Sequence, residues 1–136
     1  MTKKLLGLLM CLVLIISFSG CRQKSEIYID TQESFYSDFF VSNNKVYIKC
    51  ILTINNTTED DVNASFIGYF YEDVKTGLLK NAELKGYEDD FETSSFSIPK
   101  GKHNLTVTFI GEFAGNNQKS NRQLPDIRII NNGRLY

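Results

Sequence analysis

The sequence predicts an all-β fold, an antiparallel β-sandwich of six to eight strands within a single domain. Apolar and polar residues alternate in several runs after residue 44, which is the period of strands with one buried face. Short segments that are polar or contain glycine or proline separate these runs, as is typical of sandwiches. No strong helical pattern is present beyond the first 20 of the 136 residues.

The first part of the domain, residues 27–43, begins with the strand-like Ile27–Ile29 and is rich in aromatic residues. In a disordered stalk those side chains would expose costly apolar surface. We therefore expect the segment to pack on the domain and to end at a turn formed by Asn43 and Asn44. The aromatic residues concerned are Phe35, Tyr36, Phe39 and Phe40.

The clearest strand is Lys45–Ile54, because its apolar residues alternate without interruption. Its predicted inward face consists of Val46, Ile48, Cys50, Leu52 and Ile54. A polar loop over residues 55–61 leads to a second long strand, Val62–Asp73, which is apolar on both faces. That composition indicates a central strand, or one whose outer face is covered or binds something.

The second half of the chain contains shorter predicted strands and one ambiguous segment. The ambiguous segment, Leu78–Tyr87, fits a short helix as well as irregular strands. Gly111 indicates a bulge or a close approach of another chain segment. The expected elements are a turn at 75–77, a strand at 91–98, a turn at 99–101, a strand at 104–113, a loop at 115–123 and a last strand at 125–130.

The N-terminus has the pattern of a secretory signal peptide. Lys3 and Lys4 precede an apolar run from Leu5 to Phe18, and polar residues begin at Arg22. The run is shorter than the roughly 20 residues that a transmembrane helix needs. We therefore expect a signal-peptide helix rather than a membrane-spanning one.

The end of this segment, Phe18-Ser19-Gly20-Cys21, resembles the lipobox of bacterial lipoproteins. In that family the cysteine thiol, reactive as a thiolate, receives a diacylglyceryl group and the preceding peptide is cleaved. The resemblance implies a signal peptide at 1–20, lipidation of Cys21, a short tether at 21–26 and the domain at 27–136. It places the protein on the extracytoplasmic face of the cell membrane, held by lipid. The alternative is an ordinary signal peptide cleaved nearby, with Cys21 incidental.

The rest of the chain has a looser resemblance, carried by Lys45–Asn56, Asp61-Val62, Phe70-Tyr71-Glu72-Asp73, Gly77 and Ile98-Pro99-Lys100-Gly101. These segments look like the small immunoglobulin-like domains of bacterial envelope lipoproteins, including the FxLYD and DUF4352 types. The resemblance implies an immunoglobulin-like sandwich with a role in adhesion, envelope assembly or ligand contact. It transfers no catalytic residue. The abundance of Asn, Lys and Ile without Trp suits a Gram-positive source.

Composition argues against several classes of function. Without Lys3 and Lys4 the chain has 13 basic and 16 acidic residues, with no basic stripe of the kind that binds nucleic acid. His103 and Cys50 are too few for a zinc site, and we expect Cys50 to pack in the core, the alternatives being a nucleophile or an intermolecular disulfide. The acidic triplets 59–61 and 88–90 are interpreted as solvated loop charges, with calcium binding as the alternative. We expect no enzyme activity, metal or cofactor.

The predicted binding residues are Tyr47, Tyr69 and Tyr71, because tyrosine on an outer strand face offers large contact area with a polar tip. The alternative is that the aromatic residues of 27–43 cover them or that they line the second sheet. The predicted function is a membrane-anchored, non-enzymatic binding or accessory module for a protein or peptide ligand. One rival is an immunity or exclusion lipoprotein that sequesters a membrane-active peptide. Another is a pheromone precursor, because residues 12–18 resemble peptide sex pheromones of Gram-positive cocci.

Overall fold

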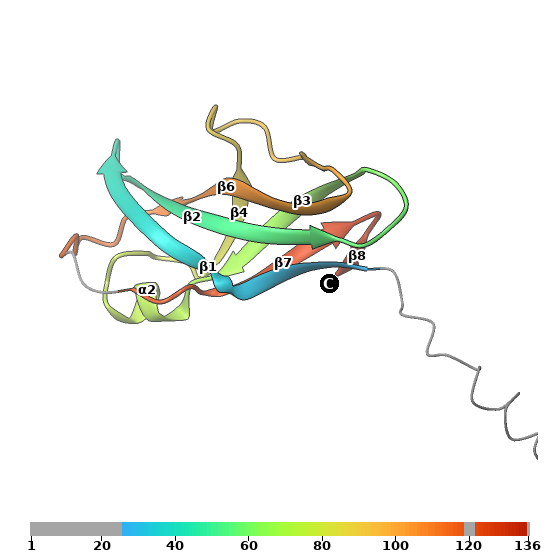
Figure 1. Ribbon diagram of the computed structural model, residues 1–136. Helices are drawn as coiled ribbons and strands as arrows, with labels where there is room; N and C mark the ends of the chain where they lie inside the picture. Colours follow the sequence, from blue (N-terminus) through green and yellow to red (C-terminus); the bar gives the residue numbers. More distant parts are fainter. Residues whose placement is uncertain (1–25, 119–121, 136) are drawn as a thin grey trace, which may run out of the picture.

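The computed structural model describes residues 26–118 and 122–135 and contains eight strands and one short helix in these ranges (Figure 1). The elements are β1 (Ile27–Ser42), β2 (Lys45–Asn56), β3 (Val62–Tyr69), α2 (Tyr71–Lys75), β4 (Glu83–Tyr87), β5 (Phe96–Ile98), β6 (Gly101–Glu112), β7 (Asp126–Asn131) and β8 (Arg134–Leu135). All strand pairs are antiparallel, which confirms the predicted all-β class and strand number. The predicted signal peptide, Cys21 and all of the tether except Glu26 lie outside the described residues.

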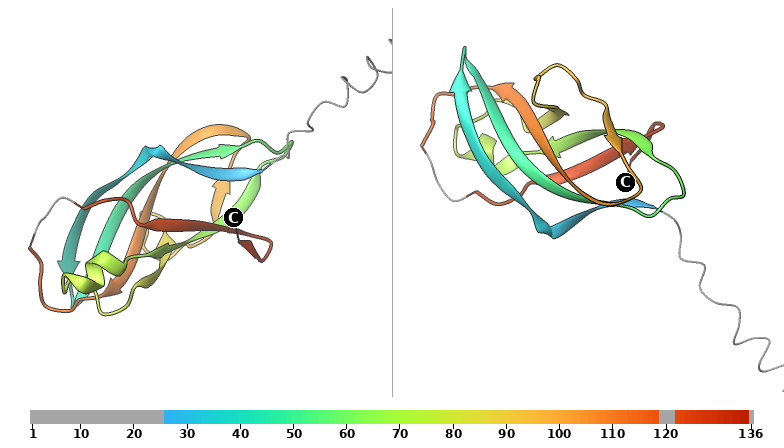
Figure 2. Two further views of the ribbon diagram at one scale, coloured as in Figure 1. Left: turned by 90° about the horizontal axis from the view of Figure 1, so that it is seen from below. Right: turned by 45° about the horizontal axis from the view of Figure 1, so that its top comes forward.

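The strands form two layers that enclose the core. Their order is β1-β2-β6-β4-β3-β7-β8, with β5 paired to β3. Strand β4 joins the layers, because Gly86 and Tyr87 pair with β6 whereas Glu83–Lys85 pair with β3. On the other side β1 and β7 are in contact (Figure 2). One layer is thus β1-β2-β6 and the other β3-β7-β8, as in an antiparallel β-sandwich.

Strand β2 supplies the centre of the core as the alternation predicts. All five predicted inward residues of this strand are fully buried, including Cys50. Each buried aliphatic side chain of this kind stabilises the fold by about 1.5–3 kcal/mol. The prediction that Cys50 packs in the core is confirmed, and burial raises the pKa of its thiol to about 12.

Strand β1 confirms that residues 27–43 pack on the domain, although only part of its aromatic surface is covered. Phe39 is buried, whereas Phe35 and Phe40 are about half exposed. The pairing with β2 is interrupted after Asp30, where the hydroxyl of Ser34 bonds back to the Asp30 carbonyl at 2.6 Å. The Ser34 hydroxyl also accepts a hydrogen bond from the backbone N–H of Thr53 at 2.9 Å, which holds this irregular edge to β2.

The turn predicted at Asn43 and Asn44 is present. Both residues have positive φ angles, 50° and 61°, as a two-residue type I′ hairpin requires. Asn132 and Gly133, with φ angles of 49° and 72°, form the same kind of turn between β7 and β8. This last hairpin is absent from the sequence-based prediction.

The predicted strand Val62–Asp73 is wrong at its end, because β3 ends at Tyr69 and α2 follows. The chain bends at Phe70, whose backbone N–H donates to the carbonyl of Ala82 at 2.8 Å. The Phe70 ring is buried against the ring of Phe109, with centroids 5.1 Å apart. Gly68 makes room for it, since a Cβ there would lie 2.5 Å from the Phe70 ring.

Two other segments differ from or complete the prediction. The ambiguous segment 78–87 contains no helix and ends in β4. The predicted strand 91–98 is wrong over most of its length, because only β5 is extended and residues 88–95 form a loop. That loop is closed locally, since the Asp90 carboxylate accepts hydrogen bonds from the backbone N–H groups of Glu92 and Thr93.

The last two predicted strands are confirmed as β6 and β7, with β6 starting earlier than expected. The close approach expected at Gly111 is also present. A Cβ on this glycine would lie 2.7 Å from a methyl carbon of Leu79 and 2.8 Å from one of Leu84. The described residues contain no helix that is both long and apolar enough to span a membrane.

Candidate functional site

A hollow with several polar groups lies at one end of the sandwich. A pocket of about 590 Å³ is enclosed by the end of β3, helix α2 and the segment that leads into β7. Its lining consists of residues 69–73, Thr76 and residues 122–126. Two of the three predicted binding residues, Tyr69 and Tyr71, are among them.

The two tyrosines form the outer wall of the pocket. Their rings are stacked, with centroids 6.2 Å apart and planes inclined by 14°. Tyr71 is 66% exposed and Tyr69 is partly buried. The bend at Phe70 produces this arrangement, because the Phe70 ring enters the core while the residues on either side stay at the surface.

The floor of the pocket contains an ion pair between Arg122 and Asp73. Their side chains are only 9% and 8% exposed, respectively. Arg122 also donates to the Thr76 hydroxyl and the Gln118 carbonyl, and its guanidinium lies 5.1 Å from the centroid of the Phe39 ring. This pair therefore links α2 to β1 and to the segment before β7.

Burial changes the acid–base properties of this floor. It raises the pKa of the Asp73 carboxyl, and the charge of Arg122 opposes that shift. Burial and the neighbouring Asp73 charge also raise the pKa of the Tyr36 hydroxyl, which has no hydrogen-bond partner within the described ranges. The Tyr36 hydroxyl thus stays neutral because its pKa is raised, and the positive charge of Arg122 lies against the Asp73 carboxylate.

The rim of the pocket is acidic. Glu72 follows Tyr71 on the exposed side of α2, and its carboxylate has no ion pair with the part of the chain that the structure describes. Asp126, at the start of β7, accepts hydrogen bonds from the Arg128 guanidinium at 3.0–3.2 Å, which raises the pKa of Arg128. The lining therefore carries three carboxylates and one guanidinium, and that guanidinium is already paired with Asp73.

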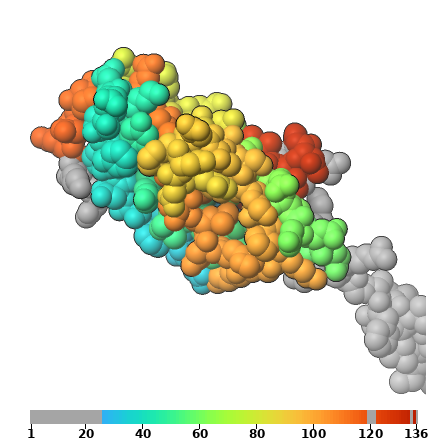
Figure 3. Space-filling model, turned by 90° about the horizontal axis from the view of Figure 1, so that it is seen from above, coloured from blue at the N-terminus to red at the C-terminus, as the bar shows by residue number. Residues whose placement is uncertain are grey.

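Tyr47, the third predicted binding residue, lies in a different cluster. Its ring stacks on Phe40 with centroids 4.7 Å apart and contacts Phe91 at 5.1 Å. Phe91 belongs to the 88–95 loop, drawn in gold beside β2 in Figure 3. For Tyr47 the structure agrees with the alternative expectation, since an aromatic residue of 27–43 covers it, and it does not join Tyr69 and Tyr71.

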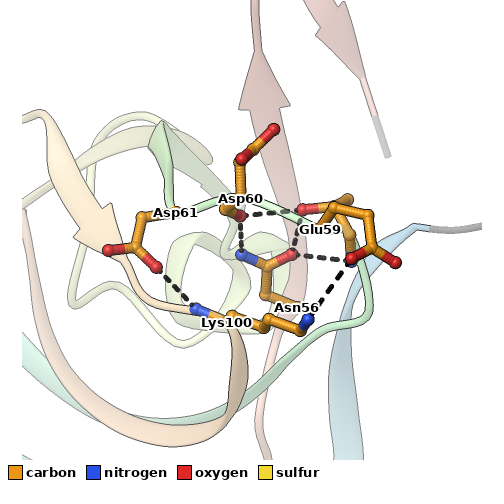
Figure 4. A network of polar contacts seen from close by, with 6 residues as sticks. Asn56, Glu59, Asp60, Asp61 and Lys100 are labelled. Carbon is orange, nitrogen blue, oxygen red and sulfur yellow. Dashed lines mark hydrogen bonds and ion pairs between the residues drawn. The ribbon is translucent and has the colours of Figure 1, made fainter.

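The acidic triplet 59–61 takes part in a local network at the opposite end of β3 (Figure 4). Lys100 pairs with Glu59 at 3.4 Å and donates its backbone N–H to the Asp61 carboxylate at 3.0 Å. The three carboxylates of the triplet point in different directions (Figure 4). Among residues 26–118 and 122–135, no group of three or more potential metal-ligating side chains is close enough to hold an ion.

Asn56 organises the same network from within the fold. Its amide donates to the backbone carbonyls of Asp60 and Ile98, and its side-chain oxygen accepts hydrogen bonds from the backbone and hydroxyl of Thr58. His103, also in this region, contacts the Lys100 carbonyl through its Nε2 atom at 2.9 Å. These contacts fix the loop conformation.

The floor residues Asp73 and Arg122 are absent from the predicted site. They are 49 positions apart, and no spacing rule connects them. The one signal in the sequence was Asp73, a charged residue at the end of an apolar run, and it did not identify Arg122 as its partner.

Comparison of the chain with family models, curated proteins and solved structures gives no match.

Proposed function

We propose that this protein is a membrane-anchored, non-enzymatic binding module that holds a protein or peptide ligand in the pocket beside α2. The observation that carries the proposal is the stacked pair of Tyr69 and Tyr71 above a buried ion pair. Ligand sites are typically concave, 300–1,000 Å³ in volume, and combine aromatic side chains with a few fixed polar groups. A pocket of about 590 Å³ lies in that range.

The position of the pocket relative to the expected anchor supports a ligand that approaches from outside the membrane. The expected lipid on Cys21 is followed by a tether of at most about 17 Å. Glu26 is fixed to the loop after β2, since its backbone bonds with Thr57 at 2.9 Å in both directions. The anchor would therefore hold this end of the sandwich near the bilayer.

Helix α2, which borders the pocket, lies at the opposite end of the sandwich from the start of β1 (Figure 1). Strand β1 runs from the Glu26 end to the hairpin at Asn43 and Asn44, and at about 3.3 Å per residue it spans up to roughly 50 Å. At the far end Asn44 accepts a hydrogen bond from Phe113, and Ala114 bonds to Leu78 just after α2. A partner would therefore meet the pocket on the side that faces away from the membrane.

The expected anchor is tested by replacing the proposed lipid site. A Cys21→Ser chain should remain unprocessed or be released into the medium, and it should not incorporate labelled fatty acid. Retention of the variant in the membrane at unchanged size would contradict the anchor.

The pocket is tested by a peptide-display selection on the full-length lipoprotein in lipid nanodiscs. Selected peptides should lose binding to Tyr71→Ser and keep it with Tyr28→Ser, a matched exposed tyrosine at the anchor end of β1. Peptides that bind both variants as well as the unmodified protein would refute the pocket as the binding site.

An immunity or exclusion lipoprotein is the second candidate, and it is a narrower form of the same proposal. The outward position and acidic rim of the pocket favour it, because a membrane-active peptide would be captured before it reached the bilayer. Expression of the protein should then protect cells from the peptide, and Tyr71→Ser should abolish the protection. The pheromone hypothesis concerns residues 12–18, outside the described residues, and stays a prediction.

A further inference from the structure

We infer that the pocket recognises a positively charged side chain, lysine or arginine, of its protein or peptide ligand. This inference rests on the proposed function and adds the chemistry of the ligand. Three features of the site carry it: the accessible tyrosine faces, the carboxylates at the rim and the engagement of the only guanidinium in the lining.

The tyrosine wall provides a surface that attracts cations. The face of an aromatic ring is electronegative, and a cation within about 6 Å of its centroid is attracted to it. Tyr69 and Tyr71 are nearly parallel and stacked, and the exposed Tyr71 ring is the one that a ligand can approach. Because Tyr71 is 66% exposed, a ligand can reach this wall without any rearrangement of the core.

The charges of the rim act in the same direction. Glu72 is adjacent to Tyr71 in α2 and is exposed, and Asp126 is the direct cross-strand partner of Tyr69 in the β3–β7 pair. The Asp126 carboxylate is 57% exposed in its ion pair with Arg128. An ammonium or guanidinium group at the tyrosine wall would therefore meet the carboxylate of Glu72, whereas that of Asp126 is shared with Arg128, whose charge also acts on Tyr69.

Arg122 does not make the pocket a site for anions. One terminal nitrogen of its guanidinium binds Asp73 and Thr76, and the other donates to the Gln118 carbonyl. The side chain is 9% exposed and lies over the Phe39 ring. Its charge is thus compensated below the surface, whereas the charge of Glu72 acts at the entrance.

The inference is tested with three synthetic peptides that differ at one central residue. The peptides are acetyl-Gly-Ser-X-Ser-Gly-amide, in which X is lysine, Nε-acetyl-lysine or glutamate. Binding to the full-length lipoprotein in nanodiscs is followed by amide chemical shifts of residues 69–76, 122–124 and 126. The lysine peptide should bind at least about five-fold more tightly than the acetylated one, and the glutamate peptide should give no saturable shift. Raising the salt concentration from about 0.05 M to about 0.5 M should weaken the lysine peptide severalfold.

Variants separate the two contributions. Glu72→Gln should weaken the lysine peptide about three-fold and Tyr71→Leu about five-fold, whereas Tyr71→Phe should bind like the unmodified protein. Asp89→Asn, which removes an exposed carboxylate from the 88–95 loop, is the matched charge control and should have no effect.

Equal binding of the lysine and acetyl-lysine peptides would overturn the inference while leaving the proposed function intact. The absence of shifts with all three peptides would also overturn the inference. The proposed function itself is decided by the independent peptide selection with Tyr71→Ser and Tyr28→Ser.

Discussion

Separating Arg122 from Asp73 should destabilise the domain more than any change at its surface. Both side chains are more than nine-tenths buried, and removing one partner of a buried pair leaves an uncompensated charge that costs about 3–5 kcal/mol. That is a large part of the 5–15 kcal/mol of a typical domain. We expect Asp73→Ala to reach this range, because the guanidinium that it leaves behind stays charged at every accessible pH.

Arg122→Met should cost less, because the remaining carboxyl of Asp73 can take up a proton. Burial already raises the pKa of this group above 3.8, and loss of the arginine removes the charge that opposes the shift. The folded variant then keeps a proton that the unfolded chain has released, so its free energy of unfolding falls as the pH rises above about 4. The unmodified protein should show the same trend more weakly.

Urea unfolding followed by far-ultraviolet circular dichroism measures both effects, with each variant examined at acidic and neutral pH. The double variant Asp73→Leu with Arg122→Met should be more stable than either single variant, since it buries no charge. Additive losses below about 1 kcal/mol for the single variants, which is the behaviour of an exposed pair, would refute the buried floor of the pocket.

Three further predictions concern the core and its edges. Burial raises the pKa of Cys50 from 9.0 to about 12. The free energy of unfolding of the unmodified protein should therefore fall above about pH 9. In urea titrations at about pH 10 this loss of free energy should be about 1 kcal/mol smaller for Cys50→Val. Gly86→Ala would place a Cβ 2.5 Å from a methyl carbon of Val107. Thermal unfolding should show a loss of stability of about 1–3 kcal/mol for this variant. The control Lys85→Ala, on the exposed side of the same strand, should change stability by less than about 0.5 kcal/mol. Asn56→Ala removes a buried amide that satisfies four hydrogen bonds and should cost about 1–3 kcal/mol, so an unchanged melting temperature would show that this network does not support the loop.

The strand regions with one buried face could be predicted from the sequence, because alternation alone specifies which side chains enter the core. Strand β2 illustrates this, since its five predicted inward residues are all fully buried. The turn at Asn43 and Asn44 was predictable for an equally local reason, because asparagine tolerates the positive φ angles that this turn needs. Both features depend on neighbouring residues only.

The 88–95 loop could not be predicted, because its conformation depends on contacts between distant residues. Phe91 has a φ angle of 61°, an uncommon value for a bulky residue. Its ring lies against Tyr47 of β2, 44 positions earlier in the chain. Nothing in the apolar pattern of residues 91–98 distinguishes this loop from a strand.

The pocket depends on the bend that the sequence did not reveal. In a continuous strand Tyr69, Tyr71 and Asp73 would share one face, since side chains two positions apart point the same way. In α2 each residue is rotated by about 100° from the previous one, so Asp73 points roughly 200° away from Tyr71. The tyrosines therefore remain together at the surface, as predicted, while Asp73 turns inward to meet Arg122.

This rotation also determines which carboxylate a ligand would meet. An extended chain would place Asp73 next to the tyrosines and turn Glu72 to the opposite face. The helical turn reverses these roles, because Asp73 is buried in its ion pair with Arg122 and Glu72 is exposed beside Tyr71. The acidic rim and the neutral floor thus have a common cause in the burial of Phe70, whose ring forces the chain to turn. A substitution that straightened this bend should therefore abolish the pocket and expose Asp73 together, without removing any of the residues that line it.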